Sequence, residues 1–369
     1  MSEYPVQFEK VQAPPLREET LARDRLLDWL HVKIHRRVVL VLAEAGYGKT
    51  TLLADFSRRT RVRVSWYRLD RGDRDWLGFI AHLVAAFRVH QPDFGPVTAS
   101  MILEASTGTL ARDTVLDAFI RELGTLAAEP AALVLDDFHL VDDSQDARII
   151  IREMMARAPE RLTFVMISRT TPSLPLARLR SLGEVVELHT PELRFARDET
   201  ERLFRETYAL DLEPGVVSEL SHRTEGWVAS LELVRAAIRD RNPSEIRSFV
   251  RSLSGAEGNL YDYLAEEVVG ELPADLQQFL MRSSLLETIE PVLGSVAAQV
   301  PPEQTRASIA DGEMLGLFSR LGPNSRDHVR AHPLVRDFLQ ARLRRSVGAA
   351  AVIEIHRAVA SAAEPIDWR

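Results

Sequence analysis

Residues 38–59 constrain the fold of this chain more than any other stretch. The apolar run VVLVLA is followed by the glycine-containing segment AEAGYGKTT and then by the amphipathic segment LLADFSRR. This order predicts a buried strand, a loop and a helix in succession. Lysine occurs only at Lys10, Lys33 and Lys49, among 46 lysines and arginines. A lysine placed between a glycine and two threonines therefore favours a chemical role over a glycine turn that merely joins strand to helix.

The loop has the groups that bind a phosphate. Backbone N–H groups of a glycine-rich loop and the N-terminus of the following helix both present partial positive charge to an anion. We expect Lys49 to contact the β- and γ-phosphates of ATP or ADP, and Thr50 to ligate Mg²⁺. Ala43 stands where the pattern G-x-x-x-x-G-K-[ST] has its first glycine. The predicted nucleotide-binding residues of the loop are Ala45, Gly46, Tyr47, Gly48, Lys49, Thr50 and Thr51.

Further apolar runs separated by amphipathic segments extend the pattern. Runs rich in β-branched and aliphatic residues predict strands buried on both faces, and the helices between them predict parallel crossovers. We therefore expect an α/β fold with a doubly wound parallel sheet. The strand-like runs are Val38–Ala43, Val62–Leu69, Ala131–Asp137 and Leu162–Ser168, with a weaker one at Val185–Leu188.

After Pro191 helical periodicity replaces the strand-like runs. Leu260, Leu264 and Val268 form one apolar stripe with helical spacing. The segments LFSRL and HVRAH flank GPNSRD, which predicts a hairpin, and a helix is expected at Leu334–Leu343. Helices followed by a hairpin and a further helix are typical of a winged helix.

Two carboxylates end one of the apolar runs. Such a pair is costly on a buried strand unless a cation or hydrogen-bond donors meet it. We expect Asp136 to hold Mg²⁺ and Asp137 to orient or deprotonate the attacking water, with a solvated strand end as the structural alternative. Arg169, after LTFVMIS, is either a γ-phosphate contact or a surface salt bridge. We interpret His139 as a hydrogen-bonded loop histidine rather than a catalytic group.

Composition excludes several classes of protein. The chain has no cysteine, which rules out disulfides, thiolate metal sites and a cysteine nucleophile. A net charge of -8 does not suggest a protein that coats nucleic acid. The N-terminus lacks the features of a signal peptide, and no apolar run approaches a membrane span. We expect a cytoplasmic protein that makes no membrane contact.

An ordered set of segments resembles one family of bacterial regulators. These segments are LARDRLL, AEAGYGKTTLL, VSWYRLDRGDRD, LVLDDFHLV, ISRTTPSLPLARLRSLGEVVEL, LRFARDE, RTEGWVASLEL, YLAEEV and VRAHPLVRDFL. Together they resemble the large ATP-binding LuxR-type transcription regulators, of which the maltose-regulon activator is the best known. That family lies within the STAND class of signal-transducing P-loop ATPases.

The resemblance implies a domain order. It consists of an N-terminal arm (1–20), a nucleotide-binding domain (21–190), a small helical domain (191–255), a winged-helix domain (256–345) and the start of a helical linker or sensor region (346–369). It also implies a switch that is closed with ADP, opens to self-associate with ATP and inducer, and is reset by slow hydrolysis. The chain stops near the start of the expected sensor, so we expect the inducer site and the DNA-binding domain to lie outside it.

The resemblance also assigns roles to single residues. Lys49 and Thr50 take the phosphate and metal roles, Asp136 and Asp137 the acidic roles, and Arg169 the sensor role. Arg23, in LARDRLL, joins the nucleotide-binding set. The segment around Trp227 is expected to pack near the base and ribose, although a core tryptophan is the structural alternative. His332 corresponds to a winged-helix residue that contacts the ADP β-phosphate, with a helix-capping or packing histidine as its alternative.

Three functions compete for this arrangement. The first is a nucleotide switch with slow ATPase activity, and the second is an ATPase that works on nucleic acid or in another signalling complex. The third is a winged-helix DNA-binding protein with a regulatory ATP site. The expected recognition helix PEQTRASIADGEM carries Glu303, Asp311 and Glu313 against Arg306 alone, which is the wrong charge for DNA. The sequence therefore favours the switch.

Overall fold

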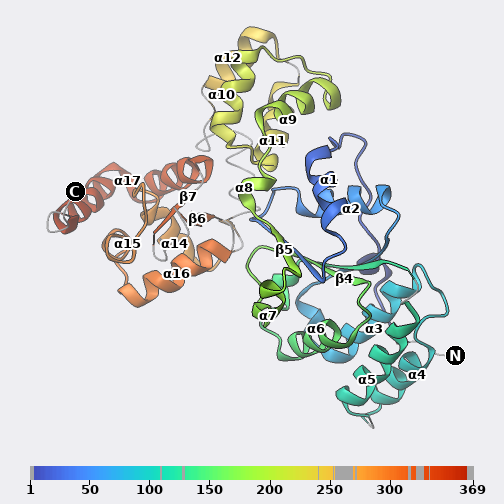
Figure 1. Cartoon of the computed structure of the whole chain (residues 1–369). Helices are drawn as coiled ribbons and strands as arrows, with labels where there is room; N and C mark the ends of the chain where they lie inside the picture. The colour runs from blue at the N-terminus through green and yellow to red at the C-terminus, as the bar shows by residue number, and fades with distance from the viewer. Residues whose placement is uncertain are drawn as a thin grey trace. The chain divides into compact units, whose positions relative to one another are not determined.

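The computed structural model describes residues 4–108, 110–126, 129–239, 241–251, 253, 269–270, 272–314, 317–320, 328–331 and 333–363. The chain divides into two compact units (Figure 1). The first comprises Met1–Ala43 and Gly48–Leu193, and the second comprises Glu44–Tyr47 and Arg194–Arg369. Four residues of the glycine-containing loop thus belong, by their contacts, to the unit that follows much later in the chain.

A five-stranded parallel sheet organises the first unit. Its strands are β1 (Val38–Leu42), β2 (Arg63–Arg68), β3 (Ala131–Asp136), β4 (Leu162–Ser168) and β5 (Val185–Leu188). The spatial order is β2-β3-β4-β1-β5, so consecutive strands are joined by crossovers rather than hairpins. The predicted α/β class is confirmed, and each apolar run of the sequence forms a strand within a residue or two of its expected bounds.

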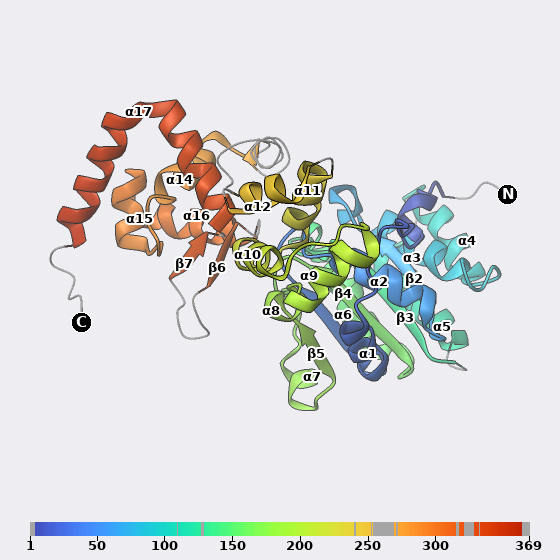
Figure 2. The ribbon, with the colours of Figure 1, turned by 90° about the horizontal axis from the view of Figure 1, so that it is seen from above.

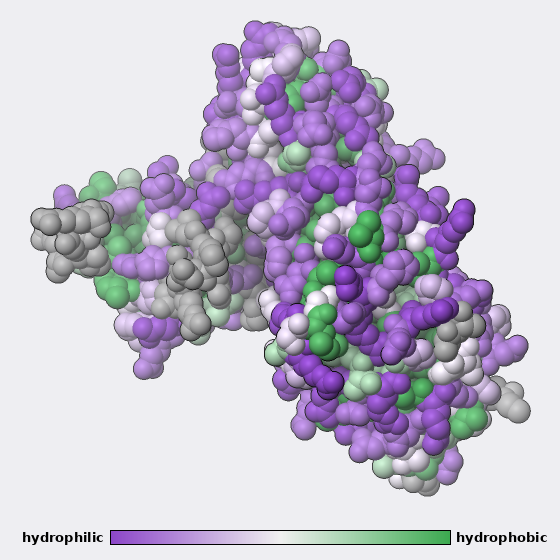
Figure 3. Space-filling view, viewed as in Figure 1, coloured by the Kyte–Doolittle hydropathy of each residue, from purple (hydrophilic) through white to green (hydrophobic). Residues whose placement is uncertain are grey.

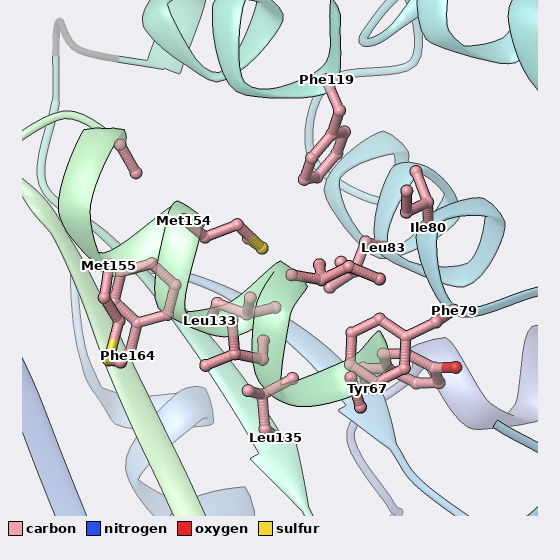
Figure 4. Close-up of a cluster of buried hydrophobic side chains, with 14 of the residues drawn as sticks. Tyr67, Phe79, Ile80, Leu83, Phe119, Leu133, Leu135, Met154, Met155 and Phe164 are labelled. Carbon is pink, nitrogen blue, oxygen red and sulfur yellow. The ribbon is translucent and has the colours of Figure 1, made fainter. Parts of the chain in front are cut away.

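Helices cover the sheet and complete its core. They are α1 (Asp24–Lys33), α2 (Lys49–Arg59), α3 (Trp76–Arg88), α4 (Pro96–Ala105), α5 (Arg112–Leu123), α6 (Gln145–Arg157), α7 (Ala177–Ser181) and α8 (Thr190–Leu193), with 3-10 turns at Phe8–Val11, Arg71–Arg74, Gly124–Leu126 and Phe138–Leu140. Figure 4 shows Leu133 and Leu135 of β3 pointing toward Phe119, Met154 and Leu83 of the helices. Alternate residues of a strand face opposite sides of the sheet, so these side chains form one of its two packed faces.

The N-terminal arm packs onto this unit. Residues Phe8–Val11 form a 3-10 turn, and Val11 is 1% exposed. Lys10 forms salt bridges with Asp70 at 2.7 Å and Asp73 at 2.9 Å. The backbone N–H of Gln7 donates to a ring nitrogen of His82 at 3.1 Å. The buried Val11 and the paired Lys10 thus anchor a segment whose composition is mainly polar.

The second unit is mainly helical. Its first helices are α9 (Arg197–Arg202), which continues into a π-helical turn at Leu203–Thr207, α10 (Pro214–Thr224), α11 (Val228–Ile238) and α12 (Pro243–Arg251). They are followed by α14 (Ala274–Ser283), α15 (Pro291–Ala298), α16 (Pro302–Met314) and α17 (Pro333–Ala363). The predicted apolar stripe of Leu260, Leu264 and Val268 lies outside the described residues, as does the expected border at 255.

The last part of this unit has winged-helix architecture. Strands β6 (Phe318–Arg320) and β7 (Val329–Ala331) pair antiparallel, as the sequence predicted, and Ile289 forms a further bridge with Val329. Figure 2 shows the hairpin strands next to α16 and α17. The helix expected at Leu334–Leu343 is longer, and α17 bends at Gly348, whose φ of 78° lies in the left-handed region. The expected turn at 322–327 lies outside the described residues.

The face shown in Figure 3 is mainly hydrophilic, with hydrophobic residues in small separate groups. Among the residues that the structure describes, no helix is both long and apolar enough to cross a bilayer.

Candidate nucleotide-binding site

The loop between β1 and α2 has the backbone that its glycines predict. Gly46 and Gly48 adopt φ values of 79° and 76°, which side-chain-bearing residues rarely take. Gly48 is the N-cap of α2, so the helix starts at Lys49. The first N–H groups of an α-helix have no partner within the helix, and its N-terminus carries partial positive charge. Strand, loop and helix follow one another as the sequence predicted, and the binding of a phosphate by the loop stays a prediction.

Lys49 and Thr50 point into the first unit, whereas Thr51 is exposed. The Lys49 side chain is 9% exposed, and its Nζ donates to the carbonyl oxygen of Ala43 at 2.6 Å. Its ammonium thus lies back along the loop rather than in bulk water. The Thr50 hydroxyl donates to Oδ1 of Asp136 at 3.1 Å. The structure therefore joins the loop to the acidic end of β3, two segments that are far apart in the sequence.

Asp136 is a buried carboxyl group, and one of its two oxygens has no hydrogen-bond partner among the described residues. It is 1% exposed, and Oδ1 also accepts the backbone N–H of Asp137 at 3.0 Å. Oδ2 has no hydrogen-bond partner in the described part of the chain. Burial, followed by the charge of Asp137, raises the pKa of Asp136 to about 6. A buried oxygen without a partner usually indicates a missing ion, water or ligand.

Asp137 stands at the strand end with a strained backbone. Its φ of 57° places it in the left-handed region, where aspartate is tolerated but uncommon. Its carboxylate lies 3.7 Å from Nε of Arg68, the last residue of β2. The Asp137 side chain is 30% exposed, in contrast to its buried neighbour. Of the two carboxylates, Asp137 is thus the one that water can reach.

His139 corrects one interpretation of the sequence. We expected a hydrogen-bonded loop histidine, but Nδ1 is buried and has no hydrogen-bond partner among the described residues. Burial, together with the charges of Arg169 and Lys49, lowers the pKa of His139 to about 4. The difference comes from tertiary structure, because His139 lies in the 3-10 turn at Phe138–Leu140 and is influenced by charged groups distant in the sequence. Its unmatched nitrogen makes it a candidate for contact with a ligand or with water.

Arg169 follows β4 and is partly buried. Its positive charge contributes to lowering the pKa of His139. It forms no ion pair with any described residue, so the alternative of a surface salt bridge has no partner within that part of the chain.

Two further predicted residues lie apart from this cluster. Arg23 is 7% exposed and is the N-cap of α1, and its guanidinium donates to the carbonyl oxygen of Leu193 at 2.6 Å. The structure thus gives Arg23 a role in joining two ends of the first unit, and its contact with nucleotide stays a prediction. His332 lies outside the described residues, so its expected role also stays a prediction.

Within the second unit, the loop segment Glu44–Tyr47 is held by contacts that the sequence did not predict. The indole N–H of Trp227 donates to the carbonyl oxygen of Ala45 at 3.0 Å, and the N–H of Ala229 donates to that of Gly46 at 3.1 Å. Tyr47 is 5% exposed and hydrogen-bonds to Arg194, and burial strongly raises its pKa. No local pattern reveals contacts between segments 182 residues apart.

The side chains of the first unit fit a hydrated Mg²⁺ ion. Mg²⁺ takes oxygen ligands, usually one or two from protein and the rest from water and phosphate. The Thr50 hydroxyl and the unmatched Oδ2 of Asp136 are such oxygens. No group of three or more His, Asp or Glu with metal-site geometry occurs in the described ranges, so a full protein cage is not provided there. These oxygens suit a metal ion that takes its remaining ligands from water or phosphate.

Two family models match the chain. An AAA domain matches residues 32–171, and the MalT winged helix domain matches residues 265–351. Curated relatives match along most of the chain. The HTH-type transcriptional regulator MalT of Klebsiella pneumoniae is 30% identical over 353 residues, and that of Cronobacter sakazakii is 29% identical over 352 residues. Both alignments cover 95% of this chain and 38% of the relative, so the chain spans well under half of those regulators.

Solved structures match as well. A signal transduction ATPase with numerous domains from Pyrococcus horikoshii aligns over 97% of this chain and 47% of its own, at 19% identity and a TM-score of 0.45. A Walker-type ATPase of Pyrococcus abyssi aligns over 92% of this chain and all of its own, at 15% identity and a TM-score of 0.59. The second likeness supports a P-loop ATPase fold. The matches confirm the resemblance drawn from the sequence: the chain joins an AAA-type ATPase domain to a winged-helix domain of the MalT kind.

Proposed function

We propose that the chain is the ATP- and ADP-binding switch module of a MalT-like transcriptional regulator. In this proposal it is closed with ADP, opens with ATP and inducer to self-associate, and returns to the closed state by slow hydrolysis. The observation that carries it is the joined set of Lys49, Thr50 and Asp136, with its unmatched carboxylate oxygen. The AAA match that contains this set, followed by the MalT winged-helix match, supports a regulator over other P-loop ATPases.

Each group of the first unit has a definite task in this proposal. Lys49 leaves the Ala43 carbonyl to meet the β- and γ-phosphates, and backbone N–H groups of the loop receive the remaining phosphate charge. Thr50 and Asp136 hold Mg²⁺, which neutralises charge on the phosphate oxygens when bound. With a pKa of about 6, Asp136 is ionised at neutral pH and available as a metal ligand.

Asp137 and its neighbours act on water. The accessible carboxylate of Asp137 orients or deprotonates the attacking water, while Arg169 stabilises charge on the γ-phosphate. His139 is neutral at physiological pH because its pKa is near 4, so its ring can hydrogen-bond to water without adding positive charge. One reaction, the hydrolysis of ATP to ADP and phosphate, would therefore reset the switch.

Loss of Lys49 tests the phosphate contact. We expect Lys49→Ala to lose on the order of 2–3 kcal/mol of ADP binding, because a charge-assisted bond to phosphate disappears from a largely dry site. Isothermal titration calorimetry measures it. Lys33→Ala, at the end of α1, removes another lysine and should leave the affinity unchanged. Equal ADP affinity in wild type and Lys49→Ala would exclude the loop as the nucleotide site.

Loss of the Asp137 carboxylate tests hydrolysis separately. Asp137→Asn keeps the shape of the side chain and the metal ligand at Asp136, so we expect nucleotide binding to survive while turnover per bound ATP falls. Phosphate release under saturating ATP measures turnover. A variant that loses binding but keeps its turnover would exchange the roles of the two carboxylates.

Turnover also separates the switch from an ATPase that works on nucleic acid. A switch is expected to purify with ADP and to hydrolyse slowly, whereas a motor hydrolyses continuously and is stimulated by DNA or RNA. We propose that DNA is contacted through a domain outside this chain and that the protein works in the cytoplasm. We also propose that the borders of the arm, the helical domain and the winged-helix domain are those expected above. Nucleotide released on denaturing the purified protein identifies the resting state.

A further inference from the structure

Two carbonyl oxygens of the phosphate loop are held by one short segment of the second unit. The segment, Trp227–Ala229, comprises the N-cap and first turn of α11. Its two donors reach neighbouring residues, since the Trp227 indole N–H bonds Ala45 and the Ala229 backbone N–H bonds Gly46. Trp227 is 6% exposed, so water competes little for its bond. These bonds fix two successive peptide groups of the loop.

Fixing a carbonyl also fixes the N–H on the other side of the same peptide. A trans peptide is planar, with its C=O and N–H pointing in opposite directions. When the Ala45 carbonyl points at Trp227, the N–H of Gly46 points away from it. When the Gly46 carbonyl points at Ala229, the N–H of Tyr47 points away likewise. The segment therefore turns two loop N–H groups in the direction opposite to itself.

The packing at Gly46 shows that this arrangement is tight. A Cβ atom at Gly46 would lie 2.6 Å from Nε1 of Trp227 and 2.7 Å from Cβ of Ala229. Distances below 3.0 Å are not tolerated by real Cβ atoms. Gly46 is thus required twice, once by its φ of 79° and once by the approach of this segment.

We propose that Trp227 and the Ala229 N–H are positioning groups that orient the phosphate loop for nucleotide. They touch the loop's carbonyls and act on the phosphates only through the loop's N–H groups. The inference rests on the proposed function, because it requires the loop to bind phosphate. It assigns Trp227 to the loop backbone, whereas the sequence suggested a place near the base and ribose. Preorganised donors bind an anion more tightly than donors that must first be oriented.

Two variants remove one donor each by different means. Trp227→Phe keeps an aromatic ring and removes the indole N–H. Ala229→Pro removes the backbone N–H at a position in the first helical turn, where proline costs no helix hydrogen bond. We expect the full chain to release a fluorescent ADP analogue about fivefold to tenfold faster in each variant, the range of one hydrogen bond. Stopped-flow displacement with excess ADP measures the rate.

Matched controls separate positioning from general damage. Val228→Pro introduces the same residue one position earlier and keeps the Ala229 N–H, and Trp76→Phe makes the same aromatic change in α3. Both should release the analogue at the wild-type rate. Urea unfolding of every variant without nucleotide reports its stability. If Trp227 had only a structural role, Trp227→Phe would lower the stability and leave the release rate unchanged.

The outcomes distinguish the two proposals. Faster release in both Trp227→Phe and Ala229→Pro, with wild-type release in the controls, supports the inference. Wild-type release in both variants, while Lys49→Ala still loses ADP, overturns the positioning role and leaves the nucleotide switch intact. Wild-type binding in Lys49→Ala as well overturns the switch itself. If Trp227→Phe does not fold, Ala229→Pro decides alone, because it leaves the indole in place.

Discussion

At the scale of single residues, the site combines a buried carboxyl group, Asp136, and a half-buried imidazole, His139, whose pKa values are shifted in opposite directions. Burial raises the pKa of Asp136 to about 6, while burial and nearby cations lower the pKa of His139 to about 4. Each group is therefore held in its neutral form more readily than in the unfolded chain. Each group also has one buried atom without a hydrogen-bond partner among the described residues, which a bound ion, water or ligand would complete.

This opposition predicts the pH dependence of stability without Mg²⁺ and nucleotide. From about pH 4 to 6 the native Asp136 keeps a proton that the unfolded residue has lost, so its contribution to the free energy of unfolding falls as pH rises. Between about pH 4 and 6.5 the unfolded His139 holds a proton that the native ring lacks, so its contribution rises with pH. In wild type the two slopes offset each other.

Single variants should expose each slope. Relative to wild type, we expect the unfolding free energy of Asp136→Asn to rise with pH from 4.5 to 6, and that of His139→Gln to fall, each by at most about 1.4 kcal/mol per pH unit. Urea unfolding in EDTA measures both. Parallel pH profiles for wild type and both variants would show that neither group titrates as its surroundings indicate.

The sequence identified most of these residues, and it missed the rest for a physical reason. Lys49, Thr50, Asp136 and Asp137 stand out because rare or costly residue types end apolar strands or begin a helix. His139 did not, since a loop histidine is common and its unmatched nitrogen exists only in the fold. Arg68 was equally hidden, because one arginine among so many carries no signal until its distance to Asp137 is known.

At the scale of elements, local sequence pattern predicted the strands but not the contacts between segments that are far apart in the chain. Strands β1 to β5 are read from apolar runs because burial on both faces demands them. The attachment of Trp227 to the loop joins residues far apart in the chain, and the anchoring of the N-terminal arm rests on Lys10 and Val11. Such contacts depend on how finished elements pack, which periodicity does not encode.

One carboxylate links several elements of the second unit. Glu225, just before the Trp227 segment, accepts hydrogen bonds from Arg330 of β7 at 3.0 and 3.2 Å and lies 3.1 Å from Arg194. Its side chain is 18% exposed, and Arg194 also hydrogen-bonds to Tyr47. A single acidic group thus connects the winged-helix hairpin to the segment that holds the loop.

Removal of this charge should destabilise the second unit. We expect Glu225→Gln to lower the free energy of unfolding by about 1–3 kcal/mol, since two partly buried guanidinium groups lose their counter-ion. Urea unfolding followed by circular dichroism measures the loss. Glu219→Gln is the matched control, because Glu219 is 38% exposed and pairs with Arg223 one turn away within α10, a contact that should be worth below about 0.5 kcal/mol. Equal losses in both variants would deny Glu225 any special role.

At the scale of the whole molecule, the division into units follows contacts rather than chain order. The loop segment Glu44–Tyr47 is covalently part of the strand–loop–helix motif but groups with Arg194–Arg369. Within that unit the segment is bonded to Trp227 and Ala229, so this part of the loop is linked to α11 by hydrogen bonds. A switch driven by nucleotide requires such a link, because a ligand shifts an equilibrium only through contacts that differ between its states.

Net charge sets the conditions under which copies of this chain can associate. Each copy carries a formal charge of -8, so two copies repel each other over distances shorter than the screening length of the buffer. That length falls from about 10 Å at 0.1 M salt to about 3 Å at 1 M. If the ATP state self-associates through a surface without strong charge pairing, added salt should favour it. Because Asp137→Asn is expected to leave ATP unhydrolysed, this variant keeps the protein bound to ATP during the measurement.

We therefore expect the average molar mass of Asp137→Asn with Mg²⁺ and ATP, measured by light scattering, to increase when NaCl is raised from about 50 to 500 mM. This raises the ionic strength about tenfold and shortens the screening length. With ADP the same protein should stay monomeric at both concentrations, because the proposed function requires the associating surface to be covered in the closed state. Lys49→Ala with ATP should resemble the ADP sample, since it lacks the phosphate contact. An ATP-dependent oligomer that dissociates as salt is added would reverse the argument and show that paired charges across the interface, rather than repulsion between whole molecules, control association.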